Sequence, residues 1–405
     1  MSDIKIWISG KYYKAVNSIA FFPAILALSF LVLSYLSISF DFSETGQQLK
    51  SQFDWLKLRD ASTARSIISS VTAGIISLTV FSFSMVMIVL NQTASQMSNR
   101  ILNELIGSRY QQIVLGIYVG TIVYSLFLLS SIRDIDSGLR IPVFSTYLLM
   151  LFTVLDVFLF IYFLHYITQS VKYEVIIRRI YAETKNSLKC SCTLKVQQQE
   201  TFSVEYGHYV NSNSSGIYEG FDKDTLISIC SAGDCSVFLM HTPGTYILKG
   251  FPVAKTSKKL SEELSEKVSN AVNINESESI SKNYFYGLRQ LTEVAIKALS
   301  PGINDPATAI ESLRALFKLY AYRIRIFPEC IINIEEGDLK ISTKELTFEK
   351  IFSETVLPVW DYGKDDRMIQ NELHDLLIQL KNIVPAACVS KLLFTVKERK
   401  NLQSK

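Results

Sequence analysis

The sequence predicts a membrane protein: four transmembrane helices, then an α+β soluble domain with a small β-barrel or sandwich and a helical C-terminal part. Two observations lead to this fold class. The first 170 residues contain four long apolar stretches, although the whole chain of 405 residues has a net charge of only +3. All six cysteines lie beyond residue 189, in a part of the chain with turn residues and amphipathic segments. We therefore expect the first part of the chain to lie in the lipid bilayer and the rest to fold in water.

The four apolar stretches each reach the length of about 20 residues that a bilayer-spanning helix needs. We expect helices at about 19–40, 66–90, 113–132 and 143–167, within a transmembrane domain of residues 1–171. Residues 172–256 are expected to form a linker helix and a small β-rich domain, and residues 257–405 a helical cytoplasmic domain. The first stretch is too long for a cleavable signal peptide, and no small-residue cleavage site follows it.

The second stretch is longer than a bilayer requires, because 34 uncharged residues separate Arg65 from Arg100. As a helix they would extend about 50 Å, so we expect a polar end beyond the membrane, near Asn99. At 100° per residue one face carries mostly small polar residues, interrupted by two apolar ones. We predict that this face lines a pore and that the two apolar positions form its gate; the proposed pore-lining residues are Ser66, Ser70, Ser77, Val80, Ser84, Ile88 and Asn91. The alternative is tight helix packing through small residues.

Asp156 lies in the middle of the fourth stretch. A carboxylate there costs at least about 2.5 kcal/mol to insert, so it should face the helix bundle or water. One interpretation is a proton or cation site. The other is a protonated carboxyl group that is hydrogen-bonded to a nearby Ser or Thr, for example on the second helix.

The Lys and Arg residues favour an orientation with the N-terminus inside. The predicted inner segments contain Lys5, Lys11, Lys14, Arg100, Arg109, Lys172, Arg178 and Arg179, and the outer loops contain Lys50, Lys57, Arg59, Arg65, Arg133 and Arg140. Free cysteines are also typical of a reducing compartment. We therefore expect a multi-pass protein of the cell's inner membrane with both termini in the cytoplasm.

The soluble part begins with a basic helix over residues 172–189 and continues into short β-like segments. Candidate strands are Thr201–Val210, Cys235–Met240 and Thr245–Leu248, with a short helix capped by Asp222 between them. Helices are expected at Ser257–Val272, Asn283–Leu299 and Pro306–Ile324, with two or three more after Leu346. Arg289, Glu293 and Lys297 have the spacing of ion pairs along one helix face.

The clearest local motif is the run Ala298-Leu-Ser-Pro-Gly-Ile-Asn-Asp-Pro306. Pro301 and Gly302 are expected to end one helix, and Asn304 or Asp305 to cap the next, which starts at Pro306. One interpretation is a well-capped turn. The other is a contact point that docks the soluble domain on the membrane part or binds a ligand; the residues proposed for it are Arg289, Ser300, Pro301, Gly302, Asn304, Asp305 and Pro306.

This motif, together with Tyr286-Gly-Leu-Arg-Gln-Leu291, resembles a bacterial family of predicted membrane proteins, domain of unknown function 2254. The Ser/Thr-rich second helix and the sequence Tyr162-Phe-Leu-His165 are similar to that family as well. The resemblance implies four membrane helices plus a soluble domain, and no established activity. The chain departs from the family at Ala307, where an aromatic residue is usual, and at Lys282 and Asn283, where an acidic residue is usual.

The sequence contains no phosphate-binding loop, zinc-protease motif, nucleophile elbow or dinucleotide-binding fingerprint. We therefore lean against an enzyme and expect no cofactor. The small net charge argues against nucleic acid as a partner. Cys190, Cys192, Cys230 and Cys235 could bind zinc, but their spacing favours free thiols and no metal site.

The leading hypothesis is a homo-oligomeric channel-like pore in the lipid bilayer, with a small ion or regulatory ligand as partner. The competing hypothesis is a non-conducting membrane-anchored scaffold or sensor.

Overall fold

The computed structural model describes residues 21–52, 61–96, 109–132, 142–170, 172–198, 205–334, 339–383 and 386–403. Contacts divide the chain into two compact units, Met1–Lys172 and Tyr173–Lys405, which we call the membrane unit and the soluble unit. Four apolar helices, then a mixed α/β region with further helices, confirm the predicted fold class. The β-rich part consists of two open sheets.

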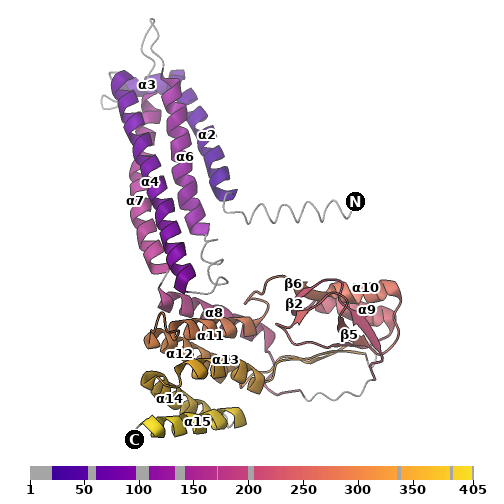
Figure 1. The fold of residues 1–405 in the computed structure, drawn as a ribbon. Coiled ribbons are helices and arrows are strands. Elements are labelled where there is room, and N and C mark those ends of the chain that lie inside the picture. Colours follow the sequence, from indigo (N-terminus) through magenta and orange to yellow (C-terminus); the bar gives the residue numbers. More distant parts are fainter. Residues whose placement is uncertain are drawn as a thin grey trace. The chain divides into compact units, whose positions relative to one another are not determined.

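The membrane unit contains four helices long and apolar enough to cross a bilayer: α2 (Phe21–Phe42), α4 (Ala61–Gln96), α6 (Arg109–Ser131) and α7 (Val143–Ser170). Figure 1 shows them running alongside one another. A short polar helix, α3 (Glu44–Gln52), follows α2. The predicted polar end of the second helix continues as helix to Gln96, whereas Asn99 lies outside the described residues.

Helix α6 is the centre of this bundle, and it approaches α2 through two glycines four residues apart. A Cβ added at Gly116 would lie 2.6 Å from Leu26 Cδ1, and one added at Gly120 would lie 2.7 Å from the ring of Phe30. Small residues at this spacing let two membrane helices pack closely. The α2–α6 contact is therefore specified by the sequence Gly116-Ile-Tyr-Val-Gly120.

A carboxylate of α2 caps the first turn of α7 and so connects the two helices. The buried carboxylate of Asp41 accepts hydrogen bonds from Phe144 N at 3.0 Å, Ser145 N at 2.7 Å and Ser145 Oγ at 2.5 Å. The Tyr124 hydroxyl lies 2.9 Å from Ser37 Oγ and donates to Ser145 O at 3.2 Å. The first amides of a helix have no intrahelical acceptor, so a carboxylate there satisfies them and complements the helix dipole.

The soluble unit contains a five-stranded sheet of order β1-β5-β3-β8-β7 and a three-stranded sheet of order β4-β2-β6. Only β3 and β8 pair in parallel; the other described pairs are antiparallel. The strands are β1 (His208–Asn211), β2 (Gly216–Phe221), β3 (Val237–Leu239), β4 (Tyr246–Ile247), β5 (Pro252–Thr256), β6 (Val272–Asn275), β7 (Ile331–Asn333) and β8 (Lys340–Thr343).

Strands β7 and β8 lie within the stretch 257–405 that was expected to be helical, because they complete a sheet begun some 120 residues earlier in the chain. Helices α9 (Lys223–Gly233) and α10 (Glu262–Ala271) pack against the strands around one apolar core (Figure 1). Its members include Leu226, Cys230, Val237, Ala254, Val268 and Ile341.

The remaining helices of the soluble unit are α8 (Tyr173–Ser191), α11 (Tyr284–Ala298), α12 (Pro306–Arg323), α13 (Phe348–Gly363), α14 (Arg367–Ile383) and α15 (Ala387–Gln403). Helix α11 packs against α8, α12 and α13. Its Thr292 hydroxyl donates to Thr355 O of α13 at 2.9 Å, and Tyr320 of α12 lies 2.5 Å from Thr355 Oγ1. The rings of Phe317, Tyr320 and Phe352 pack together beside these hydrogen bonds.

Candidate functional site

The residues predicted to line a pore share one exposed face of α4. All seven, from Ser66 to Asn91, are exposed on the single chain. The opposite face is buried against the bundle and carries Ala64, Ile68, Thr72, Ile75 and Ser82. The Ser77 hydroxyl donates to Ala73 O at 2.9 Å and the Ser84 hydroxyl to Val80 O at 2.8 Å. These hydroxyls therefore keep free lone pairs that point away from the bundle.

The outward faces of the other helices have a different chemistry. Helix α7 exposes large apolar side chains, including Leu151, Val154, Phe158 and Ile161. Helix α2 does the same with Ile25, Leu28, Val32 and Leu36. Apolar surfaces of this kind match lipid tails. Between residues 62 and 77 the exposed positions of α4 instead carry serine, threonine, alanine and glycine, with Ile76 as the one large apolar exception.

Asp156 is fully buried inside the membrane unit, so the prediction that it faces the bundle agrees with its position. Neither carboxylate oxygen has a hydrogen-bond partner among the described residues. Thr121 and Tyr118 of α6 are its polar neighbours. The Thr121 hydroxyl donates to its own helix, to Ile117 O at 3.0 Å. The predicted partner on the second helix is thus replaced by two residues of the third.

The run Ala298–Pro306 forms a turn between two antiparallel helices. Asp305 caps α12 by accepting hydrogen bonds from Thr308 N at 3.2 Å and Thr308 Oγ1 at 2.6 Å. Pro306 occupies the first turn of that helix, and Asn304 has a left-handed backbone with φ of 50°. Ser300 Oγ donates to Lys297 O at 2.7 Å. Ser300 and Asp305 are therefore used within the turn, while Pro301, Gly302 and Asn304 are exposed; a docking role stays a prediction.

Arg289 forms an ion pair outside its own helix, where the sequence suggested Glu293 as its partner. Its guanidinium pairs with the buried carboxylate of Glu278, and Asn283 Nδ2 donates to the same carboxylate at 3.3 Å. The rings of Phe285 and Tyr286 lie against the guanidinium, 5.5 and 5.9 Å from it. Arg289 thus fastens the turn before α11 to the first turns of the helix. The acidic partner of Arg289 thus lies at Glu278, before Lys282 and Asn283 in the chain.

The Gly287→Ala substitution is expected to destabilise the soluble unit, because a Cβ at this position would lie 1.9 Å from Thr184 Oγ1 of α8. Overpacking of this kind costs about 1–3 kcal/mol. Faster hydrogen exchange of the α8 and α11 amides would report the loss. The same change at Gly302, which has no atom within 4 Å, is the matched control and should be tolerated.

Combining Gly287→Ala with Thr184→Ala should recover part of this loss, since removal of Oγ1 and Cγ2 leaves only Thr184 Cβ, at 2.9 Å from the added Cβ. A double variant no more stable than Gly287→Ala alone would show that this contact does not limit how closely α8 and α11 approach.

A cavity of about 780 Å³ in the soluble unit was not anticipated from the sequence. It lies at the end of α12, at the start of α13 and beside the segment that follows α8. Its lining includes Gln198, Arg323, Phe327, Cys330, Glu345 and Phe348. Volumes of this size are typical of sites for small molecules. No sequence signal marked it, because its residues come from segments up to 190 positions apart, from Gln197 to Ala387.

Arg323 is the buried cation of this cavity. It donates from Nε to the Tyr284 hydroxyl at 3.3 Å, from Nη1 to Ile326 O at 2.7 Å and from Nη2 to Leu346 O at 3.1 Å. Burial raises the pKa of Glu345 to about 7, and the Arg323 charge opposes this rise. Burial also raises the pKa of the Cys192 thiol to about 11. The cavity thus combines a fixed positive charge with a carboxyl group that titrates near neutral pH.

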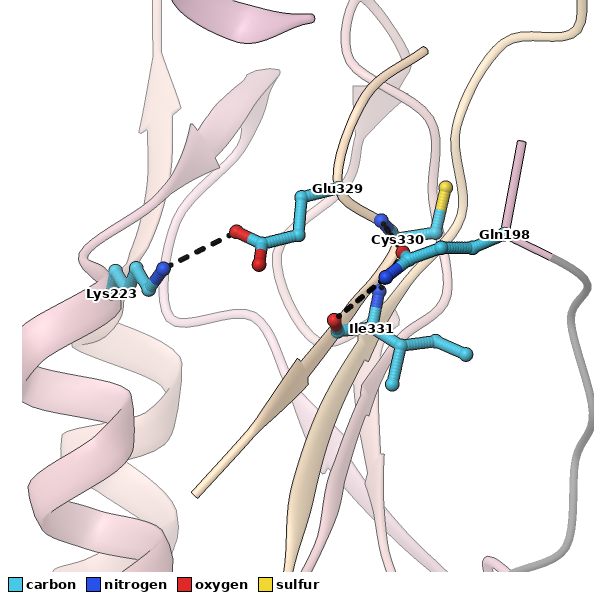
Figure 2. Close-up of polar contacts among 5 residues, drawn as sticks. All are labelled: Gln198, Lys223, Glu329, Cys330 and Ile331. Carbon is cyan, nitrogen blue, oxygen red and sulfur yellow. Dashed lines mark hydrogen bonds and ion pairs between the residues drawn. The ribbon is translucent and has the colours of Figure 1, made fainter. Parts of the chain in front are cut away.

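The amide of Gln198 holds the wall of this cavity in place (Figure 2). Its Oε1 accepts hydrogen bonds from Cys330 N at 2.9 Å and Ile331 N at 3.0 Å, and its Nε2 donates to Ile331 O at 3.5 Å. Lys223 and Glu329 form an ion pair at 3.3 Å beside this contact. Figure 2 shows the Cys330 thiol pointing away from the Gln198 amide.

The four cysteines considered for zinc do not form a metal centre in the described part of the chain, where no group of three potential ligands comes together. Cys190 is exposed at the end of α8, whereas Cys230 and Cys235 lie in the sheet core. The hydrogen bond with Cys235, followed by burial, raises the pKa of Cys230. The same hydrogen bond lowers the pKa of Cys235, and the two cysteines lie as a close pair in the apolar core.

Comparison with known protein families shows which family this chain belongs to. Residues 16–379 match the family described as predicted membrane protein, DUF2254. The chain belongs to this family. Uncharacterized proteins of Mycobacterium bovis and Mycobacterium tuberculosis are similar to this DUF2254 member, with 23% identity over 339 residues, or 80% of this chain. The aligned region covers 64% of their length, so these relatives are longer. No solved structure matches the chain significantly.

Proposed function

We propose that this DUF2254 member is a homo-oligomeric, channel-like pore lined by α4 and regulated by its soluble unit. The observation that carries the proposal is the exposed face of α4. In a monomer the serines and Asn91 of this face would meet lipid, although the outward faces of α2 and α7 are built from large apolar residues. Copies of the chain arranged around a central lumen would instead expose this face to water.

Along the lumen the hydroxyl-rich part of α4 would be followed by a more apolar part. Val80 and Ile88 are 61% and 63% exposed, with Ser84 between them. Rings of apolar side chains in an oligomer expel water and act as gates, whereas hydroxyl rings stay hydrated. Both termini and the soluble unit are assigned to the cytoplasm of a cell with this protein in its inner membrane, in accord with the Lys and Arg distribution.

A second candidate function is a non-conducting sensor whose soluble unit binds a small ligand. It is favoured by the soluble cavity, with Arg323 and Glu345 in its wall. In this case the α4 face would pack against another helix and would be dry. The two functions therefore differ in the solvent that Ser70, Ser77 and Ser84 meet.

Single cysteines at Ser70, Ser77 and Ser84 are expected to react with a membrane-impermeant, water-soluble thiol reagent. The measurement is reaction rate in reconstituted membranes, assigned by peptide mass spectrometry, so that the six native cysteines can stay. Thr72→Cys on the buried face of α4 and Phe158→Cys on the outward face of α7 are the controls and should react much more slowly. Slow reaction at all three α4 positions would refute the pore and favour the sensor.

A further inference from the structure

The membrane unit contains two buried aspartates with opposite surroundings. Asp41 is 1% exposed and accepts three hydrogen bonds at the start of α7, where the helix dipole also favours a negative charge. Asp156, on the same helix bundle, is 0% exposed and has no hydrogen bond to either oxygen among the described residues. The first carboxylate is stabilised as an anion, whereas the second is not.

An unpaired, ionised carboxylate costs several kcal/mol or more in an apolar environment. Protonation removes most of this cost, and the resulting O–H needs a single acceptor. The hydroxyl oxygens of Thr121 and Tyr118 are the nearby polar atoms of α6. On α7 itself, the residues one and two turns after Asp156 are the apolar Leu159 and Phe163.

Among the described residues, no basic group interacts with Asp156. Helix α6 contributes Tyr118 as its titratable neighbour, and α4 contributes the uncharged Ser82 near that tyrosine. On α7 itself, His165 is exposed and nine residues away. Asp41 of α2 binds Ser145, which lies about 16 Å along α7 from Asp156. Arg65 of α4 donates to Ile132 O at 3.3 Å, far from this level of the bundle.

A cavity of about 210 Å³ between α4 and α6 reaches Ser82 and Tyr118, and apolar side chains, including Phe163 of α7, form most of its lining. Gln111, Gln112 and Leu90 line one end, and Ser82 and Tyr118 line the other. From Gln111 to Tyr118 it extends about 10 Å along α6. The hydroxyls of Ser82 and Tyr118 are buried near each other, and neither has a hydrogen-bond partner within the described residues. They are therefore available to exchange a hydrogen bond with an entering water molecule.

We propose that Asp156 is a proton-binding site inside each bundle: its carboxyl group is protonated at neutral pH and exchanges its proton through the α4–α6 cavity, with Tyr118 and Ser82 as the relay. When Asp156 releases its proton, a water molecule at the cavity mouth accepts it. When the carboxylate is protonated again, a water molecule there supplies the proton. This site is distinct from the exposed face of α4 and does not depend on a pore there.

Carbodiimide labelling tests the protonation state directly. A protonated carboxyl group adds through oxygen to the central carbon of a carbodiimide and gives its proton to nitrogen, and an acyl shift then yields a stable N-acylurea. The ionised carboxylate lacks this proton. An apolar carbodiimide applied to the full-length protein in membranes at pH 7 should label Asp156, as read by peptide mass spectrometry, and labelling should decrease at alkaline pH.

Asp41 is the matched control, because it is equally buried but fully hydrogen-bonded as an anion, and it should stay unlabelled. Asp156→Asn should remove both the adduct and the infrared C=O band of a protonated carboxylic acid. The absence of adduct and band in folded wild-type protein at pH 7 would overturn the proposal. Loss of labelling when sodium replaces choline at constant pH would overturn it too, by assigning the site to a metal cation.

The relay is tested by kinetics. In the double variant Tyr118→Phe with Ser82→Ala, the carboxylic acid band should still change after a pH jump, to the same final extent as in wild type but more slowly. An unchanged rate would exclude this path for the proton. Both substitutions remove one oxygen and preserve the shape of the cavity wall, so a folding defect is not expected.

Discussion

Replacing Val80 and Ile88 together by serine is expected to increase ion flux through reconstituted protein by about tenfold or more. If α4 lines a pore, the two apolar rings set the dewetting barrier, and a reduction of about 1.4 kcal/mol in that barrier gives a tenfold higher rate. The measurement is ion flux into liposomes that contain the purified protein, for several ions and voltages, with empty liposomes as the baseline. Both positions are exposed on the single chain, so the substitution should not disturb the bundle.

The matched control is Val154→Ser with Ile161→Ser on α7. These residues have the same side-chain types and are 55% and 59% exposed, but their exposed neighbours Leu151, Leu155 and Phe158 are apolar. Their replacement should leave flux unchanged. If neither the wild type nor the α4 variant conducts above empty liposomes, the pore is refuted and the soluble cavity becomes the place to search for function.

The Arg323→Met substitution is expected to destabilise the soluble unit by about 3–5 kcal/mol, the usual cost of removing one partner from a buried charged network. Tyr284 OH, Ile326 O and Leu346 O each lose a hydrogen-bond donor, and Glu345 loses the positive charge of Arg323 near its carboxyl group. Hydrogen exchange of the α12 and α13 amides in the full-length protein measures the loss. Arg325→Met, at an exposed position two residues on, should change stability by less than about 0.5 kcal/mol.

The stability of the soluble unit, measured in the same way, is expected to depend on pH through Glu345. Below pH 4.5 its carboxyl group is protonated in the folded and the unfolded chain and contributes nothing. Between pH 4.5 and 7 the folded chain still binds a proton that the unfolded chain has released, so stability falls as the pH rises. A rise in the pKa from 4.5 to about 7 corresponds to a total of about 3 kcal/mol. Glu345→Gln should flatten this part of the profile; an unchanged slope would show that the carboxyl group is not the titrating group.

The membrane helices and several helix starts could be predicted from local sequence. A bilayer requires about 20 apolar residues per helix, so the four spans follow from composition alone. Asp222, Asn283 and Asp305 cap α9, α11 and α12 at positions that the capping rules indicate. A helix cap depends on residues only a few positions apart, so it can be predicted from the local sequence.

The sheets and the buried polar partners could not be predicted in the same way. The strand β2 contains two glycines, which weaken its β signal, yet it pairs with both β4 and β6. Glu278 lies eleven residues before Arg289, so no helical spacing links them. Asp41 reaches the start of α7 more than 100 residues later.

By itself, the sequence determined that this DUF2254 member crosses a membrane with four helices, that α4 carries a polar face, and that a carboxyl group lies at mid-span. Length, periodicity and composition are enough to predict these features, because each depends on residues within a single membrane-spanning stretch. Only the tertiary structure decided which way each group faces. It turned the α4 face outward, buried Asp156 beside Thr121 and Tyr118 of α6, and assembled Arg323 and Glu345 around one cavity, since these arrangements depend on contacts between segments far apart in the chain.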